Sequence, residues 1–207
     1  MLKLYLALAL LHILHCNGKI CQRSKKPLEM IVLYESLCPD SQSYIKNFWP
    51  VYRKYHQCIN LTLVPYGKAS PSSSAPFGHT CQHGDSECWG NRMQDCAIHS
   101  NLNQFDQMKF LECQMKDLQL TVKKNFTCAR ALNIEDHVER CMRPSGRGNQ
   151  LQTQSSIITN RYSFSVIPAI VYDGVFSVNL QRSSRMKVSQ TLCNIMIKKN
   201  LLLPDDC

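Results

Sequence analysis

The residues best suited to chemistry are Cys38-Pro39-Asp40-Ser41, which place a thiol directly in front of a predicted helix. An apolar, strand-forming run covers residues 28–33. Pro39 suits the first position of a helix, because its missing amide proton would have no partner there. The free amide protons and partial positive charge of a helix start stabilise a thiolate. Cys38 is therefore the candidate nucleophile, and the alternative is a buried structural thiol.

Ser41 stands three residues after Cys38, where a second sulfur would let the pair close a disulfide. A serine hydroxyl is too weak a nucleophile to displace a thiolate from sulfur. A mixed disulfide on Cys38 would therefore need an external thiol to release it. Ser41 is placed to donate a hydrogen bond to the Cys38 thiolate, whereas Asp40 adds a negative charge that opposes ionisation.

The cysteine count itself indicates one free thiol. Of twelve cysteines, Cys16 falls in a predicted leader, which leaves 12 − 1 = 11. Cysteines are expected to pair in an oxidising compartment, so an odd number leaves one over. If that one is Cys38, the other ten can form five bridges: Cys21, Cys58, Cys81, Cys88, Cys96, Cys113, Cys128, Cys141, Cys193 and Cys207.

Two of the five bridges can be predicted from the expected fold. Cys21 and Cys58 each precede a predicted parallel strand, so both should lie at the same end of the sheet. Cys193, on the last predicted helix, is expected to hold the C-terminal tail through Cys207. The other six cysteines stay unassigned from the sequence.

The cysteines of residues 81–96, CQHGDSECWGNRMQDC, also allow a zinc site with His79, His83 and His99. The gaps of six and seven residues between Cys81, Cys88 and Cys96 are wider than the short knuckle of structural zinc sites. We therefore expect no metal here.

The same stretch resembles the signature of the gamma-interferon-inducible lysosomal thiol reductases. That pattern is CQHG, two residues, EC, two residues, N, four residues and C. Its fixed positions are all present: Cys81, Gln82, His83, Gly84, Glu87, Cys88, Asn91 and Cys96. YESLC, LTLVPYG and the terminal PDDC extend the resemblance over nearly all of the chain beyond the leader.

The resemblance implies a thioredoxin-like fold that reduces protein disulfides through a CxxC motif, from which Ser41 departs. It also implies a cis bond at Pro168, opposite the reactive cysteine, with the backbone of Ile167 pairing with an extended substrate. The site residues are then Cys38, Ser41 and Pro168. No resident cofactor is implied, and an external low-molecular-weight thiol such as glutathione or free cysteine would supply the electrons. Lysosomal delivery is a further property of the family.

The hydrophobic periodicity agrees with an α/β protein of that fold. Strand-like runs at residues 28–33 and 59–64 flank a helix that begins after Cys38, which predicts a right-handed parallel unit. Four more helices are expected. One covers residues 105–118, a second begins after a cap at Asn133, a third ends near Tyr162, and the last covers residues 186–196. A hairpin is expected to pair residues 164–172 with 175–180 through Asp173-Gly174. We expect a single domain at residues 19–207, with a disulfide-rich helical insertion at about 68–162 between the second and third strands.

The N-terminal segment, the glycosylation motifs and the net charge indicate where the protein is located and which partners it lacks. Residues 1–18 have the lone Lys3, short apolar core and small residues of a secretory leader. Asn60 and Asn125 are glycosylation acceptors, which agrees with a secretory route, and we expect no transmembrane anchor. The net charge of +9 is scattered and not interleaved with aromatic residues, so we expect no nucleic-acid partner.

The sequence thus supports two functions of different classes. The first is a secreted or lysosomal thiol–disulfide oxidoreductase that acts on disulfide-containing proteins through Cys38. The second is a catalytically impaired relative that keeps the scaffold and has a secreted binding or immune role.

Overall fold

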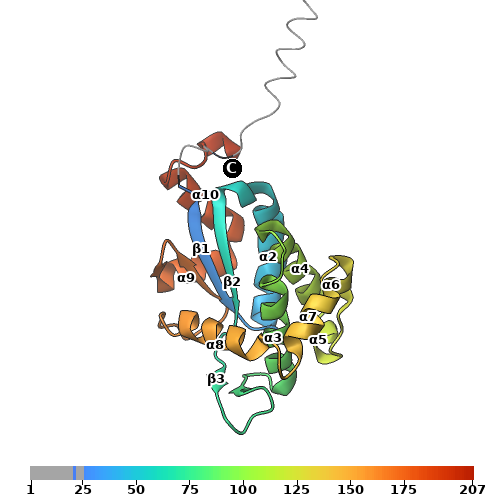
Figure 1. Cartoon of the computed structure of the whole chain (residues 1–207). Coiled ribbons are helices and arrows are strands. Elements are labelled where there is room, and N and C mark those ends of the chain that lie inside the picture. Colours follow the sequence, from blue (N-terminus) through green and yellow to red (C-terminus); the bar gives the residue numbers. More distant parts are fainter. Residues whose placement is uncertain (1–20, 22–25) are drawn as a thin grey trace, which may run out of the picture.

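A four-stranded sheet organises the computed structural model, which describes Cys21 and residues 26–207. The predicted leader lies outside the described residues. The strands are β1 (Leu28–Tyr34), β2 (Ile59–Pro65), β5 (Ala169–Tyr172) and β6 (Val175–Phe176), in the order β2-β1-β5-β6. β1 and β2 run parallel, whereas β5 is antiparallel to both β1 and β6. Figure 1 shows β1 and β2 side by side in the middle of the molecule.

Helix α2 (Pro39–Tyr55) connects β1 to β2 through a short 3-10 turn, η1 (His56–Cys58). Its apolar residues recur at helical spacing, and Ile45, Phe48 and Tyr52 are buried against the sheet. The predicted strand-helix-strand unit is therefore confirmed.

Alternate residues of β1 enter two different cores, because successive side chains of a strand point to opposite faces. Met30 and Val32 are fully buried in the larger core, which α2 covers. Leu33 enters a smaller core together with Cys38 and Ile167. This smaller core thus holds the predicted nucleophile, Cys38.

The chain between β2 and β5 is mainly helical and forms a third core of its own. A short antiparallel pair, β3 and β4, comes before the first of these helices, and β3 is labelled in Figure 1. The elements are β3 (Ser70–Pro71), β4 (His79–Thr80), α3 (Asp85–Ile98), α4 (Gln104–Lys116), α5 (Gln119–Val122), α6 (Thr127–Ala131), α7 (Glu135–Met142) and α8 (Gly148–Thr159).

Asn133 does not cap a helix as predicted. Its φ of 57° places it in the left-handed region, and α7 begins two residues later with Ile134 at its N-cap. Asparagine adopts this conformation more readily than most residues, so it turns the chain between α6 and α7.

The predicted hairpin exists but is shorter on both sides. β5 begins at Ala169 instead of residue 164, and β6 ends at Phe176, after which α9 (Val178–Met186) follows. Ser177 ends the strand because its hydroxyl accepts the Leu180 N–H as a helix cap. The Gln181 side chain of α9 then forms hydrogen bonds with the backbone of Val166, Pro168 and Ile170. These bonds replace the backbone hydrogen bonds that a longer partner strand would have formed.

The chain ends with α10 (Val188–Lys198) and a 3-10 turn, η2 (Pro204–Asp206). The Cys193–Cys207 bridge fixes this tail, and Cys21–Cys58 joins the segment before β1 to the start of β2. Both pairings are as predicted. Within the described part of the chain, every helix is too short or too polar to cross a bilayer.

Candidate active site

Cys38 lies at the N-cap of α2, immediately after the turn that follows β1. Its N–H donates to the Glu35 carbonyl at 3.3 Å, and its own carbonyl accepts the Gln42 N–H at 3.0 Å. Of the cysteines that the structure describes, Cys38 is the one without a disulfide, as predicted. Cys38 is buried, with 8% of the surface of the residue exposed. This burial agrees with the alternative interpretation of Cys38 as a buried structural thiol.

Ser41 is fully buried in the first turn of α2, and its contact differs from the prediction. Its Oγ accepts the Glu35 N–H at 3.3 Å. A hydrogen bond from Ser41 to Cys38 does not occur among the described residues. Ser41 therefore fixes the turn in front of Cys38, and the position that a second sulfur would occupy faces that turn.

The charge of Asp40 is offset by a residue that the sequence analysis missed. Arg185 of α9 donates to the Asp40 carboxylate at 2.6 Å, and the Asp40 side chain is 61% exposed. This exposed ion pair reduces the electrostatic repulsion between Asp40 and a thiolate at Cys38. The two residues are 145 positions apart, so no local sequence pattern predicts the pair.

The Ile167–Pro168 peptide bond is cis, as the resemblance implied. Ile167 and Ala169, on either side of Pro168, pack in the same small core as Cys38. The structure therefore brings the predicted nucleophile and the predicted proline loop together.

Two surface hollows adjoin this loop, with volumes of about 730 and 490 Å³. Val166, Val178 and Gln181 line both of them, and Asp40 and Tyr44 of α2 also line the smaller one. Cys38 lines neither hollow, but the surface between the start of α2 and the proline loop has room for a polypeptide segment.

The remaining cysteines form three bridges in the helical region: Cys81–Cys88, Cys96–Cys141 and Cys113–Cys128. All ten cysteines predicted to be structural are therefore paired. The alternative zinc site with thiolate ligands is wrong, since the sulfurs that it required are bonded to each other.

The residues of the 81–96 stretch hold the turn before Cys38. Asn91 Oδ1 accepts the Ser36 N–H at 2.8 Å, and Ser36 Oγ donates to the Glu87 carbonyl at 3.0 Å. Gly90 lets α3 approach this closely, because a Cβ there would lie 2.4 Å from Ser36 Oγ. The stretch thus supports the turn before Cys38 from the side of α3.

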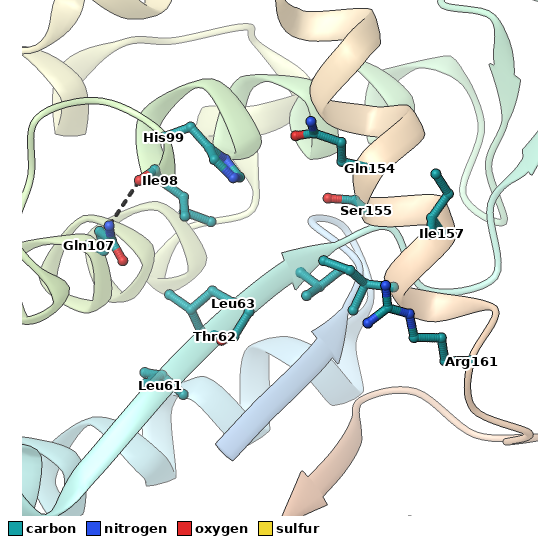
Figure 2. A pocket seen from close by; sticks show the side chains of 12 residues that line it. Leu61, Thr62, Leu63, Ile98, His99, Gln107, Gln154, Ser155, Ile157 and Arg161 are labelled. Atoms are coloured by element: carbon teal, nitrogen blue, oxygen red, sulfur yellow. Dashed lines mark hydrogen bonds between the residues drawn. The ribbon is translucent and has the colours of Figure 1, made fainter. Parts of the chain in front are cut away.

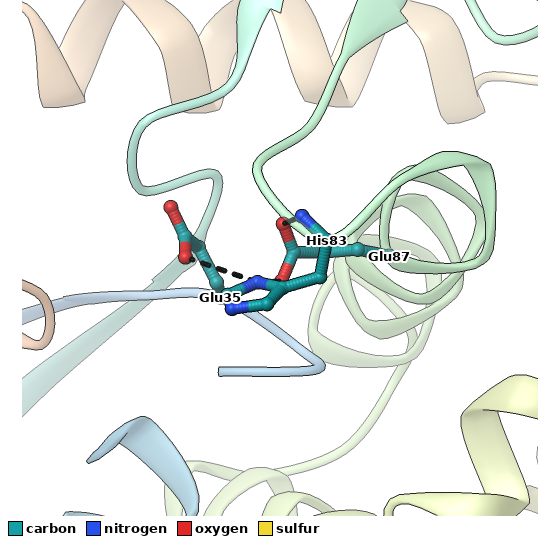
Figure 3. A group of neighbouring side chains, drawn as sticks. All are labelled: Glu35, His83 and Glu87. Atoms are coloured by element: carbon teal, nitrogen blue, oxygen red, sulfur yellow. Dashed lines mark hydrogen bonds and ion pairs between the residues drawn. The ribbon is translucent and has the colours of Figure 1, made fainter. Parts of the chain in front are cut away.

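Glu35, His83 and Glu87 form a second contact between the same two segments, shown in Figure 3. His83 Nδ1 lies 2.5 Å from Glu87 Oε2 and 3.7 Å from Glu35 Oε2. Glu35 Oε1 accepts the Lys68 N–H at 2.7 Å. Burial raises the pKa of Glu35, and the nearby Glu87 carboxylate raises it further, whereas the hydrogen bond from the Lys68 N–H lowers it.

Comparison with known proteins agrees with this site. Residues 29–132 match the family model described as gamma interferon inducible lysosomal thiol reductase (GILT). A GILT-like protein of Anopheles gambiae is 30% identical over 86% of this chain and 78% of its own length. The chain belongs to the GILT family. GILT-like protein 1 of Drosophila melanogaster is 27% identical, over 78% of this chain and 72% of its own.

Solved structures extend the comparison to the fold. Reduced DsbA1 from Neisseria meningitidis aligns over 84% of this chain and 87% of its own, with a TM-score of 0.51 and 9% identity. An oxidized mutant of DsbA1 aligns over 84% and 86%, with a TM-score of 0.52 and 10% identity. At such low identity the likeness shows the fold alone, and it confirms the thioredoxin-like prediction for this GILT-family chain.

Asp95, at a variable position of the GILT signature, is a fully buried carboxyl group. Ser155 Oγ donates to it at 2.8 Å and Gln152 Nε2 at 2.6 Å. Burial raises the pKa of Asp95 to about 7, although both hydrogen bonds act in the opposite direction. This group links α3 to α8, and sequence reasoning missed it.

A cavity of about 470 Å³ lies next to this link, between β2, the end of α3 and α8. Figure 2 shows Ser155 and Gln154 on α8 and His99 at the end of α3, with Leu61 and Leu63 on β2 below them. Neither Cys38 nor Pro168 lines it, so it is separate from the candidate site at Cys38.

Replacing Asn91 by alanine is expected to reduce the free energy of unfolding by about 1–3 kcal/mol, because the buried Ser36 N–H loses its acceptor. Urea unfolding with the disulfides intact measures this. The control is Asn101→Ala on the exposed surface, expected within about 0.5 kcal/mol of the parent protein. Equal stability of the two variants would show that Asn91 does not support the turn.

Proposed function

We propose that this protein is a thiol–disulfide oxidoreductase that acts on protein disulfides through Cys38 and depends on an external thiol. The observation that carries the proposal is the position of Cys38, an unbridged thiol among the described cysteines, at the start of α2 in a GILT scaffold. The names of the relatives supply the class of reaction.

The first step is attack of the Cys38 thiolate on one sulfur of a substrate disulfide. A bond forms between Cys38 Sγ and that sulfur, the substrate disulfide breaks, and the second substrate sulfur leaves as a thiolate. The amide groups at the start of α2 favour the attacking thiolate, and the pairing of Asp40 with Arg185 reduces an opposing charge.

The second step uses an external thiol, of the class of glutathione or free cysteine. Its thiolate attacks either sulfur of the mixed disulfide and releases the other sulfur, that of Cys38 or that of the substrate, as a thiolate. A second external thiol then attacks the new mixed disulfide and releases the sulfur that is still bound. Two external thiols are oxidised to one disulfide while one substrate disulfide becomes two thiols. Ser41 has no sulfur with which to replace them.

The secretory route belongs to the same proposal, with lysosomal or secreted protein as its end points. Five disulfides support an oxidising compartment during folding. Asn60 is exposed on β2 and Asn125 is partly exposed after α5, so both glycosylation acceptors lie where a glycan has space.

The direct test is the rate of disulfide reduction as a function of glutathione concentration. We expect the rate to rise with glutathione and Cys38→Ala to reduce it by at least about 10³-fold, because the nucleophile is gone. Peptide mapping of the five bridges controls for folding of the variant. A folded Cys38→Ala protein with the parent rate would refute the proposal.

A non-catalytic binding role is the second candidate, and two observations favour it. Ser41 replaces the second sulfur of the family motif, and Cys38 is 8% exposed. This role predicts that Cys38→Ala leaves partner binding or immune activity intact, and that the parent protein does not accelerate disulfide reduction over glutathione alone at any concentration.

A further inference from the structure

Glu35, His83 and Glu87 converge from the turn before Cys38 and from the GILT signature (Figure 3). One nitrogen or oxygen atom from each residue lies within 4.8 Å of the corresponding atom of the other two. Ligand atoms around a tetrahedral Zn²⁺ are about 3.4 Å apart, given metal–ligand bonds of about 2.1 Å. His83 Nδ1 already lies 2.5 Å from Glu87 Oε2 and 3.7 Å from Glu35 Oε2, so adjustments of about an ångström among the three side chains would give these separations.

When both carboxylates are ionised, the charges of the three side chains do not balance. The Glu35 and Glu87 side chains are 1% and 0% exposed, and a protonated imidazole supplies at most one positive charge for two carboxylates. Buried carboxylates are costly unless they are paired or bound to a metal. A divalent cation beside a neutral His83 would make the group neutral.

Glu35 supplies an independent sign of a missing ligand. Its Oε2 is buried and accepts no hydrogen bond from any described residue, although it points toward His83. The other oxygen, Oε1, is occupied by the Lys68 N–H. An acceptor left unsatisfied in a fully buried carboxylate is unusual and requires a partner.

We propose that Glu35, His83 and Glu87 bind a divalent transition-metal ion of the Zn²⁺ class, through two carboxylate oxygens and His83 Nδ1. The imidazole ligand favours such an ion over Ca²⁺ or Mg²⁺, which prefer oxygen ligands alone. Solvent on the exposed side of His83 would complete the coordination. The site uses no cysteine and is therefore different from the zinc site considered from the sequence.

Bound metal would join the turn three residues before Cys38 to the start of α3. The existing contacts between these segments run through Ser36, Asn91 and the Glu87 carbonyl. Glu35 and the signature residues His83 and Glu87 would then have a common role, which is to fix that turn through a metal ion.

The test is titration of metal-free protein with Zn²⁺ against a chromophoric chelator near neutral pH, in a Cys38→Ser background that removes the free thiolate as a ligand. We expect one Zn²⁺ per chain and at least about tenfold weaker binding in Glu35→Gln and His83→Gln. The matched control is His99→Gln, which removes a histidine 3.9 Å from the single carboxylate of Asp95 and should leave binding unchanged.

Absence of saturable Zn²⁺ binding by the background protein would overturn the proposal, as would binding that persists unchanged in folded Glu35→Gln and His83→Gln. Disulfide mapping shows whether the variants fold. If they do not, Co²⁺ binding to the background protein decides: saturation at one ion per chain with a spectrum of nitrogen and oxygen ligation supports the site, and failure to bind refutes it.

Discussion

Replacing Ser41 by cysteine is expected to shorten the lifetime of a mixed disulfide on Cys38 by at least about 100-fold when no external thiol is present. Position 41 lies in the first turn of α2, three residues after Cys38, so the new thiol, buried against the turn that precedes Cys38, would be close to the adduct. A tethered thiol acts at an effective concentration of about millimolar or more, whereas the parent protein has no resolving thiol.

The measurement is the decay of a preformed adduct, quenched in acid and followed by mass spectrometry. Ser43→Cys is the matched control, because it adds a thiol to the same helix at an exposed position five residues from Cys38. The control should decay as slowly as the parent protein. Equal adduct lifetimes in Ser41→Cys and the parent protein would show that the missing sulfur is not what limits release.

The second large effect is a pH dependence of stability that arises from Asp95. Its pKa is about 7 in the folded protein against 3.8 as a free side chain, so the folded state holds the proton more tightly. Between these values the folded state binds more protons than the unfolded state, and stability falls as pH rises. We expect the Asp95 contribution to make the protein about 2–3 kcal/mol more stable at about pH 5 than at about pH 7.5.

Urea unfolding across this pH range in the parent protein and Asp95→Asn measures the effect. The asparagine cannot ionise, so the Asp95 part of the slope should disappear. Asp136→Asn on the exposed face of α7 serves as the control and should keep the parent slope. An unchanged slope in Asp95→Asn would show that the buried carboxyl does not set the pH dependence.

Local patterns were sufficient for the part of the fold that carries Cys38. The apolar run of β1, the proline after Cys38 and the stripe of α2 each act over a few residues, so they could be read directly. The odd cysteine number identified a free thiol, and the strand order placed Cys21 beside Cys58.

The contacts that support the site could not be predicted in this way, because they join distant parts of the chain. Asn91 bonds Ser36 across 55 positions, and Arg185 bonds Asp40 across 145. Neither residue is unusual in its own local sequence. The resemblance marked Asn91 and Glu87 as fixed positions, but the structure was needed to show that they hold the turn before Cys38.

The hairpin was overextended for a related reason. Residues 175–180 alternate like a strand, but the Ser177 cap and the bonds from Gln181 to the 166–170 backbone favour a helix there. Such side-chain bonds to the backbone form only when the neighbouring strand is in place, and the periodicity of residues 175–180 carries no information about that strand. Periodicity alone therefore assigns these residues to β structure.

The most direct test of the central claim is to map the adduct formed with a disulfide-bonded peptide. The protein would be incubated with the peptide at acidic pH, quenched in acid, alkylated and digested. The account predicts one mixed disulfide, on Cys38, with the ten bridged cysteines still in their five disulfides. Folded protein without an adduct, or with Cys38 bonded to another cysteine of the same chain, would contradict it.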